Sequence, residues 1–100
     1  MIDPQFQNLT SEQKLSAIRH YEKEVEQLFA AGKITEWDLW ECYFELMYNC
    51  NLAGFNEDRE RIADKIDKEK FNPFLSKRME IIIIARDIAA RHKIQTKLDN

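Results

Sequence analysis

The sequence contains few of the residues that interrupt regular structure or build covalent and metal-bound centres. Its 100 residues include only two glycines, two prolines, two cysteines and two histidines. Loops that bind nucleotide phosphates need several neighbouring glycines, so that backbone N–H groups can approach the anion. Zinc sites need cysteine or histidine at short spacing. Neither pattern is present, so we expect no such nucleotide loop, no metal site and no cofactor.

Long apolar runs are also missing. The longest run covers residues 81–85 and is closed by Glu80 and Arg86, whereas a membrane span needs roughly 20 apolar residues. The first residues lack the basic and apolar segments of a signal peptide. Cys42 and Cys50 lie eight residues apart in one predicted helix, roughly 12 Å, which is too far for a disulfide. Free thiols fit a reducing compartment, so we expect a cytoplasmic protein without a membrane span.

What the sequence does contain is the pattern of an all-α domain. Hydrophobic residues make up 44% and charged residues 33%, a composition typical of a packed globular chain. One hundred residues suit one domain, because two separate cores would each be too small. We predict a compact four-helix domain with flexible tails at residues 1–9 and 96–100. The predicted helices cover 11–31, 36–53, 57–69 and 73–95.

Side chains that favour helix starts precede each predicted helix. These residues are Thr10 (with Gln13 in a capping box), Thr35, Asn56 and Asn72, which is followed by Pro73. Gly32 and Gly54 are placed to end the first two helices. The few glycines and prolines therefore fall at the predicted boundaries, which supports the division into four.

The second predicted helix is the most apolar and should lie at the centre of the domain. Large apolar side chains cover more than half of its circumference. The remaining polar strip is predicted to face water and consists of Asp38, Glu41, Glu45 and Asn49. The third predicted helix has only Ile62, Ala63 and Ile66 to bury, so we expect it to be the least stable.

The last predicted helix carries more apolar residues than one buried face needs. Its core side is predicted to contain Phe74, Ile81, Ile82, Ala85, Ile88 and Ala89. A second stripe on nearly the opposite side contains Met79, Ile83, Ala90 and Ile94, with Arg86 beside it. Either the domain encloses this helix on both sides, or the second stripe contacts another chain. We take these five residues as a candidate partner-binding surface.

Charge is unevenly distributed along the chain. Residues 1–67 carry a net charge of −7 and residues 68–98 carry +5. The two parts either attract each other within the domain or form a polarised surface that steers a charged partner. A candidate acidic contact surface for a basic partner is formed by Asp38, Glu41, Glu45 and Tyr48. Nucleic-acid binding through the basic last helix is disfavoured, because the acidic remainder would repel phosphates.

No arrangement of residues typical of a catalytic site is present, and we expect no enzyme activity. The sequence predicts a protein-binding module that acts as an inhibitor or adaptor of a partner protein, or that forms a homodimer through its last helix. Two alternatives stay open. One is a regulator that contacts nucleic acid through the last helix. The other is a small enzyme whose site is assembled between helices and leaves no local motif.

Overall fold

The computed structural model describes residues 8–71 and 78–94, without the side chains of Lys68, Phe71, Arg78 and Met79. This part of the chain is all-α and contains no strand. It confirms the predicted four-helix domain, to which a single short turn of helix is added. The elements are α2 (Ser11–Ala30), α3 (Glu36–Ala53), α4 (Asn56–Ala63), the short α5 (Lys68–Phe71) and α6 (Arg78–Arg91).

The first two helices begin at the predicted capping residues. The Thr10 side chain accepts a hydrogen bond from the Gln13 N–H at 3.1 Å, and the Gln13 side chain accepts one from the Thr10 N–H at 3.0 Å. Thr35 and Asp38 form the same reciprocal pair at 3.1 and 3.0 Å. Each capping box pairs two backbone N–H groups that would otherwise lack a partner at the helix start.

The third predicted helix differs from its prediction at both ends. Asn56 is the first residue of α4 and not its cap. The cap position belongs to Phe55, which makes no side-chain capping bond. The helix ends at Ala63 and does not run to residue 69. Asp67 explains the break, because its carboxylate accepts the backbone N–H groups of Glu69 and Lys70 at 3.1 and 3.4 Å. Aspartate favours such local capping bonds over a helix interior.

The isoleucine run of α6 is helical, as predicted, and the predicted start at residue 73 lies outside the described residues. The helix ends at Arg91, earlier than the predicted residue 95. Its end is closed by two backbone bonds, from the Ile94 N–H to the Ala89 carbonyl at 2.9 Å and from the Lys93 N–H to the Ala90 carbonyl at 3.2 Å. This is a Schellman motif. It requires a left-handed residue, and Lys93 has a φ of 56°.

Lys93→Gly is expected to stabilise the domain by about 1 kcal/mol, because glycine adopts a left-handed conformation without the steric cost of a Cβ atom. The two other helix ends of this kind already place Gly32 and Gly54 at the left-handed position, with φ of 72° and 80°. Urea unfolding of the two proteins measures the difference. Gly54→Ala is the reverse control and should destabilise by a similar amount. A lower stability of Lys93→Gly would contradict the prediction.

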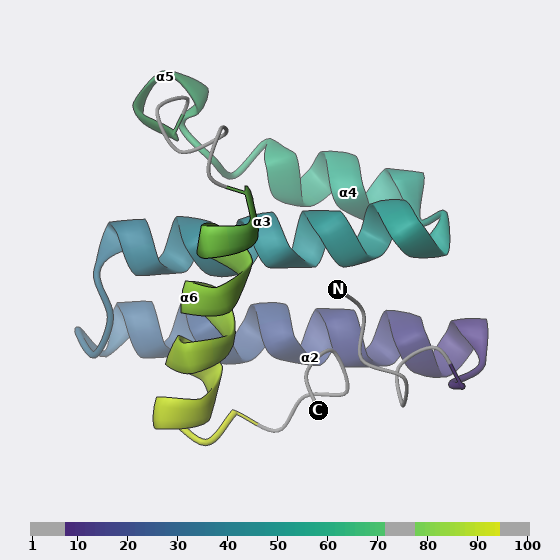
Figure 1. Ribbon diagram of the computed structural model, residues 1–100, viewed down its shortest axis with the longest axis horizontal. Helices are drawn as coiled ribbons and strands as arrows, with labels where there is room; N and C mark the ends of the chain where they lie inside the picture. Colours follow the sequence, from purple (N-terminus) through teal and green to yellow (C-terminus); the bar gives the residue numbers. More distant parts are fainter. Residues whose placement is uncertain (1–7, 72–77, 95–100) are drawn as a thin grey trace.

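Helix α3 lies at the centre and contacts α2, α4 and α6. In Figure 1, α2, α3 and α4 run side by side in alternating directions, and α6 crosses α2 and α3 steeply. The buried face of α6 is the predicted one, except that Phe74 lies outside the described residues. Its members are at most 1% exposed and comprise Ile81, Ile82, Ala85, Ile88 and Ala89. The direction in which α6 crosses α3 determines which residues of α3 are shielded from solvent.

Candidate functional site

The polar strip of α3 is not on the surface, and the prediction that it faces water is wrong. Glu41 is 7% exposed, Glu45 0% and Asn49 1%, and Asp38 is half-buried. Helix α6 contacts α3, and its Arg86 reaches Glu45 on this strip. The acidic contact surface predicted from Asp38, Glu41, Glu45 and Tyr48 therefore loses its two glutamates, while Tyr48 is half-buried.

Glu45 and Arg86 form an ion pair between α3 and α6. The Arg86 Nε donates to Glu45 Oε2 at 3.0 Å, and the Arg86 side chain is 26% exposed. Close by, the Tyr21 hydroxyl donates to the Ala85 carbonyl at 3.2 Å. Burial, followed by the Glu45 charge, raises the pKa of Tyr21 well above its ordinary value. These groups fix α2 and α3 against α6.

Both cysteines are buried and unpaired. Burial raises the pKa of the Cys42 thiol to about 12, and that of Cys50 also to about 12. The thiolate is the reactive form of cysteine, and at neutral pH almost none of either thiol is ionised. The two cysteines therefore act as small apolar core residues.

Glu41 lies one turn before Glu45 on α3, in a different environment. Its Oε2 is buried and has no hydrogen-bond partner within the described residues. Burial, then the charges of Asp38 and Glu80, raise its pKa to about 7. Glu80 belongs to the first turn of α6. The junction of α3 and α6 thus contains a carboxyl group that changes charge near neutral pH, which no single-helix pattern could indicate.

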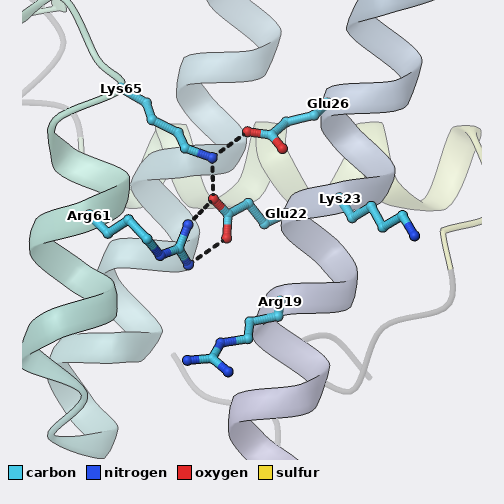
Figure 2. A pocket seen from close by; sticks show the side chains of 6 residues that line it. All are labelled: Arg19, Glu22, Lys23, Glu26, Arg61 and Lys65. Atoms are coloured by element: carbon cyan, nitrogen blue, oxygen red, sulfur yellow. Dashed lines mark hydrogen bonds and ion pairs between the residues drawn. The ribbon is translucent and has the colours of Figure 1, made fainter.

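A second polar cluster, also missed by the sequence analysis, connects α2 to α4 (Figure 2). The Glu22 carboxylate, 6% exposed, accepts hydrogen bonds from Arg61 at 2.6 and 2.7 Å and from Lys65 at 2.6 Å. Lys65 also contacts Glu26 at 2.7 Å. The bonds from Arg61 and Lys65 therefore join α4 and the turn after it to the neighbouring helix α2.

The same cluster continues toward the start of α4. Asp58 accepts hydrogen bonds from Arg19 at 3.1 and 3.2 Å and from Arg61 at 3.0 Å. A depression of about 290 Å³ between the helices is lined by Arg19, Glu22, Lys23, Glu26, Arg61 and Lys65. In Figure 2, Lys23 points away from the paired groups. Because Arg61 and Lys65 bind Glu22 and Glu26 of α2, the cluster attaches α4 and the residues that follow it to the domain.

Glu22→Gln is expected to destabilise the protein by about 1–2 kcal/mol at pH 6, because charge-assisted bonds to the buried carboxylate are lost. Burial alone would raise the pKa of Glu22, but the bonds from Arg61 and Lys65 outweigh it and lower the pKa below 4.5. A carboxylate whose pKa is lowered in the folded state stabilises the fold at pH values above its ordinary pKa. This stabilisation is lost as the pH falls through the folded-state pKa.

The difference from the unmodified protein should therefore shrink in urea unfolding below about pH 4.5. The pKa of Asp58 is also lowered from 3.8, chiefly by Arg19. Protonation of Asp58 in acid should therefore destabilise both proteins. The matched control is Glu24→Gln on the same helix, outside the cluster. A penalty for Glu22→Gln that stayed constant from pH 6 to pH 3 would refute the electrostatic explanation.

The predicted surface of α6 is not one continuous stripe. Ile83 is 61% exposed and Ala90 is exposed. Ile94, however, is 9% exposed, because the helix ends before it and the chain turns back into the core. Arg86 points toward Glu45, and the side chain of Met79 lies outside the described residues. The predicted partner-binding surface was therefore wrong to include Ile94 and to place Arg86 on an open surface.

Two large apolar side chains are exposed on either side of the α2–α3 turn. Phe29 near the end of α2 is 40% exposed, and Trp37 in the first turn of α3 is 39% exposed. The Trp37 ring meets Trp40 edge to face, with centroids 5.0 Å apart. Acidic residues flank Trp37 in the chain at Glu36 and Asp38. This turn therefore combines aromatic surface with negative charge.

Within residues 8–71 and 78–94, the structure contains no helix with the length and apolarity needed to cross a membrane and no cluster of potential metal ligands. No protein-family model, curated protein or solved structure matches this chain.

Proposed function

We propose that this protein is a binding module that acts as an inhibitor or adaptor of a partner protein with a basic surface. The proposal depends on the exposed aromatic pair at the α2–α3 turn. We define the corner surface as Phe29, Glu36, Trp37 and Asp38. Phe29 and Trp37 are 40% and 39% exposed as whole residues, although a large aromatic residue is more stable when buried.

The chemistry of the corner surface favours a protein partner. Tryptophan is enriched among residues that dominate binding energy at protein interfaces, where large rings fill pockets on the partner. Carboxylates around such an anchor favour a partner with complementary basic residues and accelerate their encounter. The net charge of −7 over residues 1–67 has the same sign. A basic cleft with an apolar pocket is the expected counterpart.

Self-association through α6 is the second candidate, and the exposure of Ile83 favours it. Its support is weaker than the sequence indicated, because Ile94 is buried and only Ala90 remains beside Ile83 in the described part of the stripe. Arg91 pairs with Asp87 on the same helix at 2.9 Å, and Arg86 pairs with Glu45. These pairs also reduce the positive charge that α6 could offer to nucleic acid.

The test is affinity capture from the native lysate, together with light scattering over a concentration series. Three exposed positions in separate places give matched variants, Trp37→Gln at the corner surface, Leu52→Gln near the opposite end of α3 and Ile83→Lys on α6. Each removes one exposed apolar side chain, of which Leu52 is 51% exposed. We expect a stoichiometric partner that is lost with Trp37→Gln and retained with the other two variants.

The alternative results are distinct. A dimer of the unmodified protein that becomes monomeric with Ile83→Lys would establish self-association through α6. Equal capture of a partner by all three variants would refute the corner surface as the contact. Absence of a retained partner and of a dimer would refute both candidates. Thermal unfolding of each variant confirms that a lost interaction is not a lost fold.

A further inference from the structure

Two depressions adjoin each other between α2 and α4. The first, about 290 Å³, is the charged depression of Figure 2. The second, about 440 Å³, lies at the α3–α4 turn and the start of α4, and Arg19 of α2 lines both. Asp58 lines the second depression and accepts hydrogen bonds from Arg19 at 3.1 and 3.2 Å and from Arg61 of the first at 3.0 Å. The two depressions therefore meet at the Arg19–Asp58 pair, and we call them together the α2–α4 groove.

The first depression has an excess of positive charge. Two carboxylates, Glu22 and Glu26, line it together with four cations, which are Arg19, Lys23, Arg61 and Lys65. One positive charge remains in excess even when Asp58 is counted with them. Within residues 8–71 and 78–94, Lys23 forms no ion pair. Its four-carbon stem is flexible, so its ammonium can turn toward an anion above the paired groups.

The cations of the first depression can be reached from solvent. The side chains of Arg19, Arg61 and Lys65 are 59%, 43% and 35% exposed. Arg19 binds Asp58 through Nε and Nη2, and Arg61 binds its carboxylates through Nη1 and Nη2. A guanidinium has five N–H donors, so both arginines retain donors beyond these bonds. An anion can therefore bind here without displacing the carboxylates.

The second depression has a different character. Leu15 and Phe55, both half-buried, give it apolar surface. Its carboxylates are Asp58, which Arg19 binds, and Glu57, which is exposed. Negative charge on a ligand is thus favoured in the first depression and disfavoured in the second. An apolar group on the same ligand finds its contacts in the second.

A phosphate group suits the first depression. A phosphate monoester carries a charge of about −1.5 to −2 at pH 7 and three strong acceptor oxygens, and arginine and lysine are its usual donors. Pockets for drug-sized ligands span roughly 300–1,000 Å³, so about 290 Å³ suits a single small group. A nucleic acid would carry further phosphates over the acidic remainder of residues 1–67, whose net charge is −7, and would be repelled.

We propose that the α2–α4 groove binds a phosphate monoester that carries an apolar group. The phosphate lies in the first depression, and the apolar group lies on Leu15 and Phe55 in the second. The residues that line the two depressions include none of the corner surface, so this is a second site, independent of the proposed protein contact. The net charge of −3 opposes the anion only weakly at 0.1 M salt, where charges are screened over about 10 Å.

The experiment is an NMR titration of the full chain at pH 7.5 in 0.1 M sodium chloride, with phenyl phosphate, inorganic phosphate or phenol. We expect phenyl phosphate to bind about tenfold more tightly than inorganic phosphate, because part of its ring is buried. Phenol, which lacks the phosphate, should show no saturable binding. The amide shifts should concentrate in residues 15–26 and 54–65. A peptide with phosphotyrosine identifies the source: tighter binding than phenyl phosphate indicates a phosphorylated protein, and equal or weaker binding indicates a small molecule.

Matched variants separate the groove from general attraction. Lys23→Gln should weaken both phosphates about fivefold, whereas Lys33→Gln, the same charge change at an exposed position of the α2–α3 turn, should leave them unchanged. Leu15→Gln should remove the advantage of phenyl phosphate but keep the affinity for inorganic phosphate, which shows that the fold is intact. Leu52→Gln, outside the groove, should preserve the advantage.

Three results would overturn the inference. The first is an equal effect of Lys23→Gln and Lys33→Gln on phosphate affinity. The second is equal affinity of the unmodified protein for phenyl phosphate and inorganic phosphate. The third is a set of amide shifts spread over the basic residues of α6 as strongly as over the groove, which would indicate nonspecific attraction.

Discussion

Arg86→Met is expected to destabilise the protein by about 3 kcal/mol at pH 8. Methionine preserves most of the apolar stem of the side chain but removes the cation that faces Glu45, which is 0% exposed. Removing one partner of a buried ion pair is strongly destabilising, since the remaining charge keeps its desolvation cost without the compensating attraction. Urea unfolding at pH 8 measures the loss.

A matched control exists on the same helix. Arg91 pairs with Asp87 at 2.9 Å, but these side chains are 59% and 63% exposed, and exposed pairs contribute little. Arg91→Met should therefore change stability by less than about 0.5 kcal/mol. The double variant Arg86→Met, Glu45→Gln should recover part of the loss, because no buried charge remains. Equal effects of Arg86→Met and Arg91→Met would disprove the role of this pair.

Glu41→Gln is expected to have the opposite effect and to stabilise the free protein at pH 8 by about 2 kcal/mol. The pKa of Glu41 is raised from 4.5 to about 7 in the folded state. A raised folded-state pKa means that the folded protein binds the proton more tightly than the unfolded chain does. The resulting stability is fully present below pH 4.5 and is lost as pH rises through 7.

Glutamine is neutral at every pH, so it avoids the cost of burying a charge between Asp38 and Glu80. Unfolding free energies measured from pH 5 to pH 8 should diverge between the two proteins, with near equality at pH 5. Glu80→Gln, which removes one neighbouring charge, should move the transition to lower pH. Parallel pH profiles for Glu41→Gln and the unmodified protein would show that Glu41 does not titrate in this range.

The helices and most of their ends could be predicted from the sequence, because these features depend on local interactions. Thr10 and Thr35 cap through residues three positions away, and the apolar face of α6 follows from a period of 3.6 residues. The break near Asp67 and the early end at Lys93 were missed. In both places the local pattern permitted a longer helix, and the observed end depends on a capping bond or a left-handed residue.

The polar clusters could not be predicted, because each joins residues far apart in the chain. A single-helix pattern correctly placed the polar residues of α3 on one strip, yet it assigned that strip to solvent. The steep crossing of α6 decides that Glu41 and Glu45 are buried, and the position of α4 decides that Arg61 pairs with Glu22. Local sequence determines which face of a helix is polar, whereas the packing of its neighbours determines whether that face meets water.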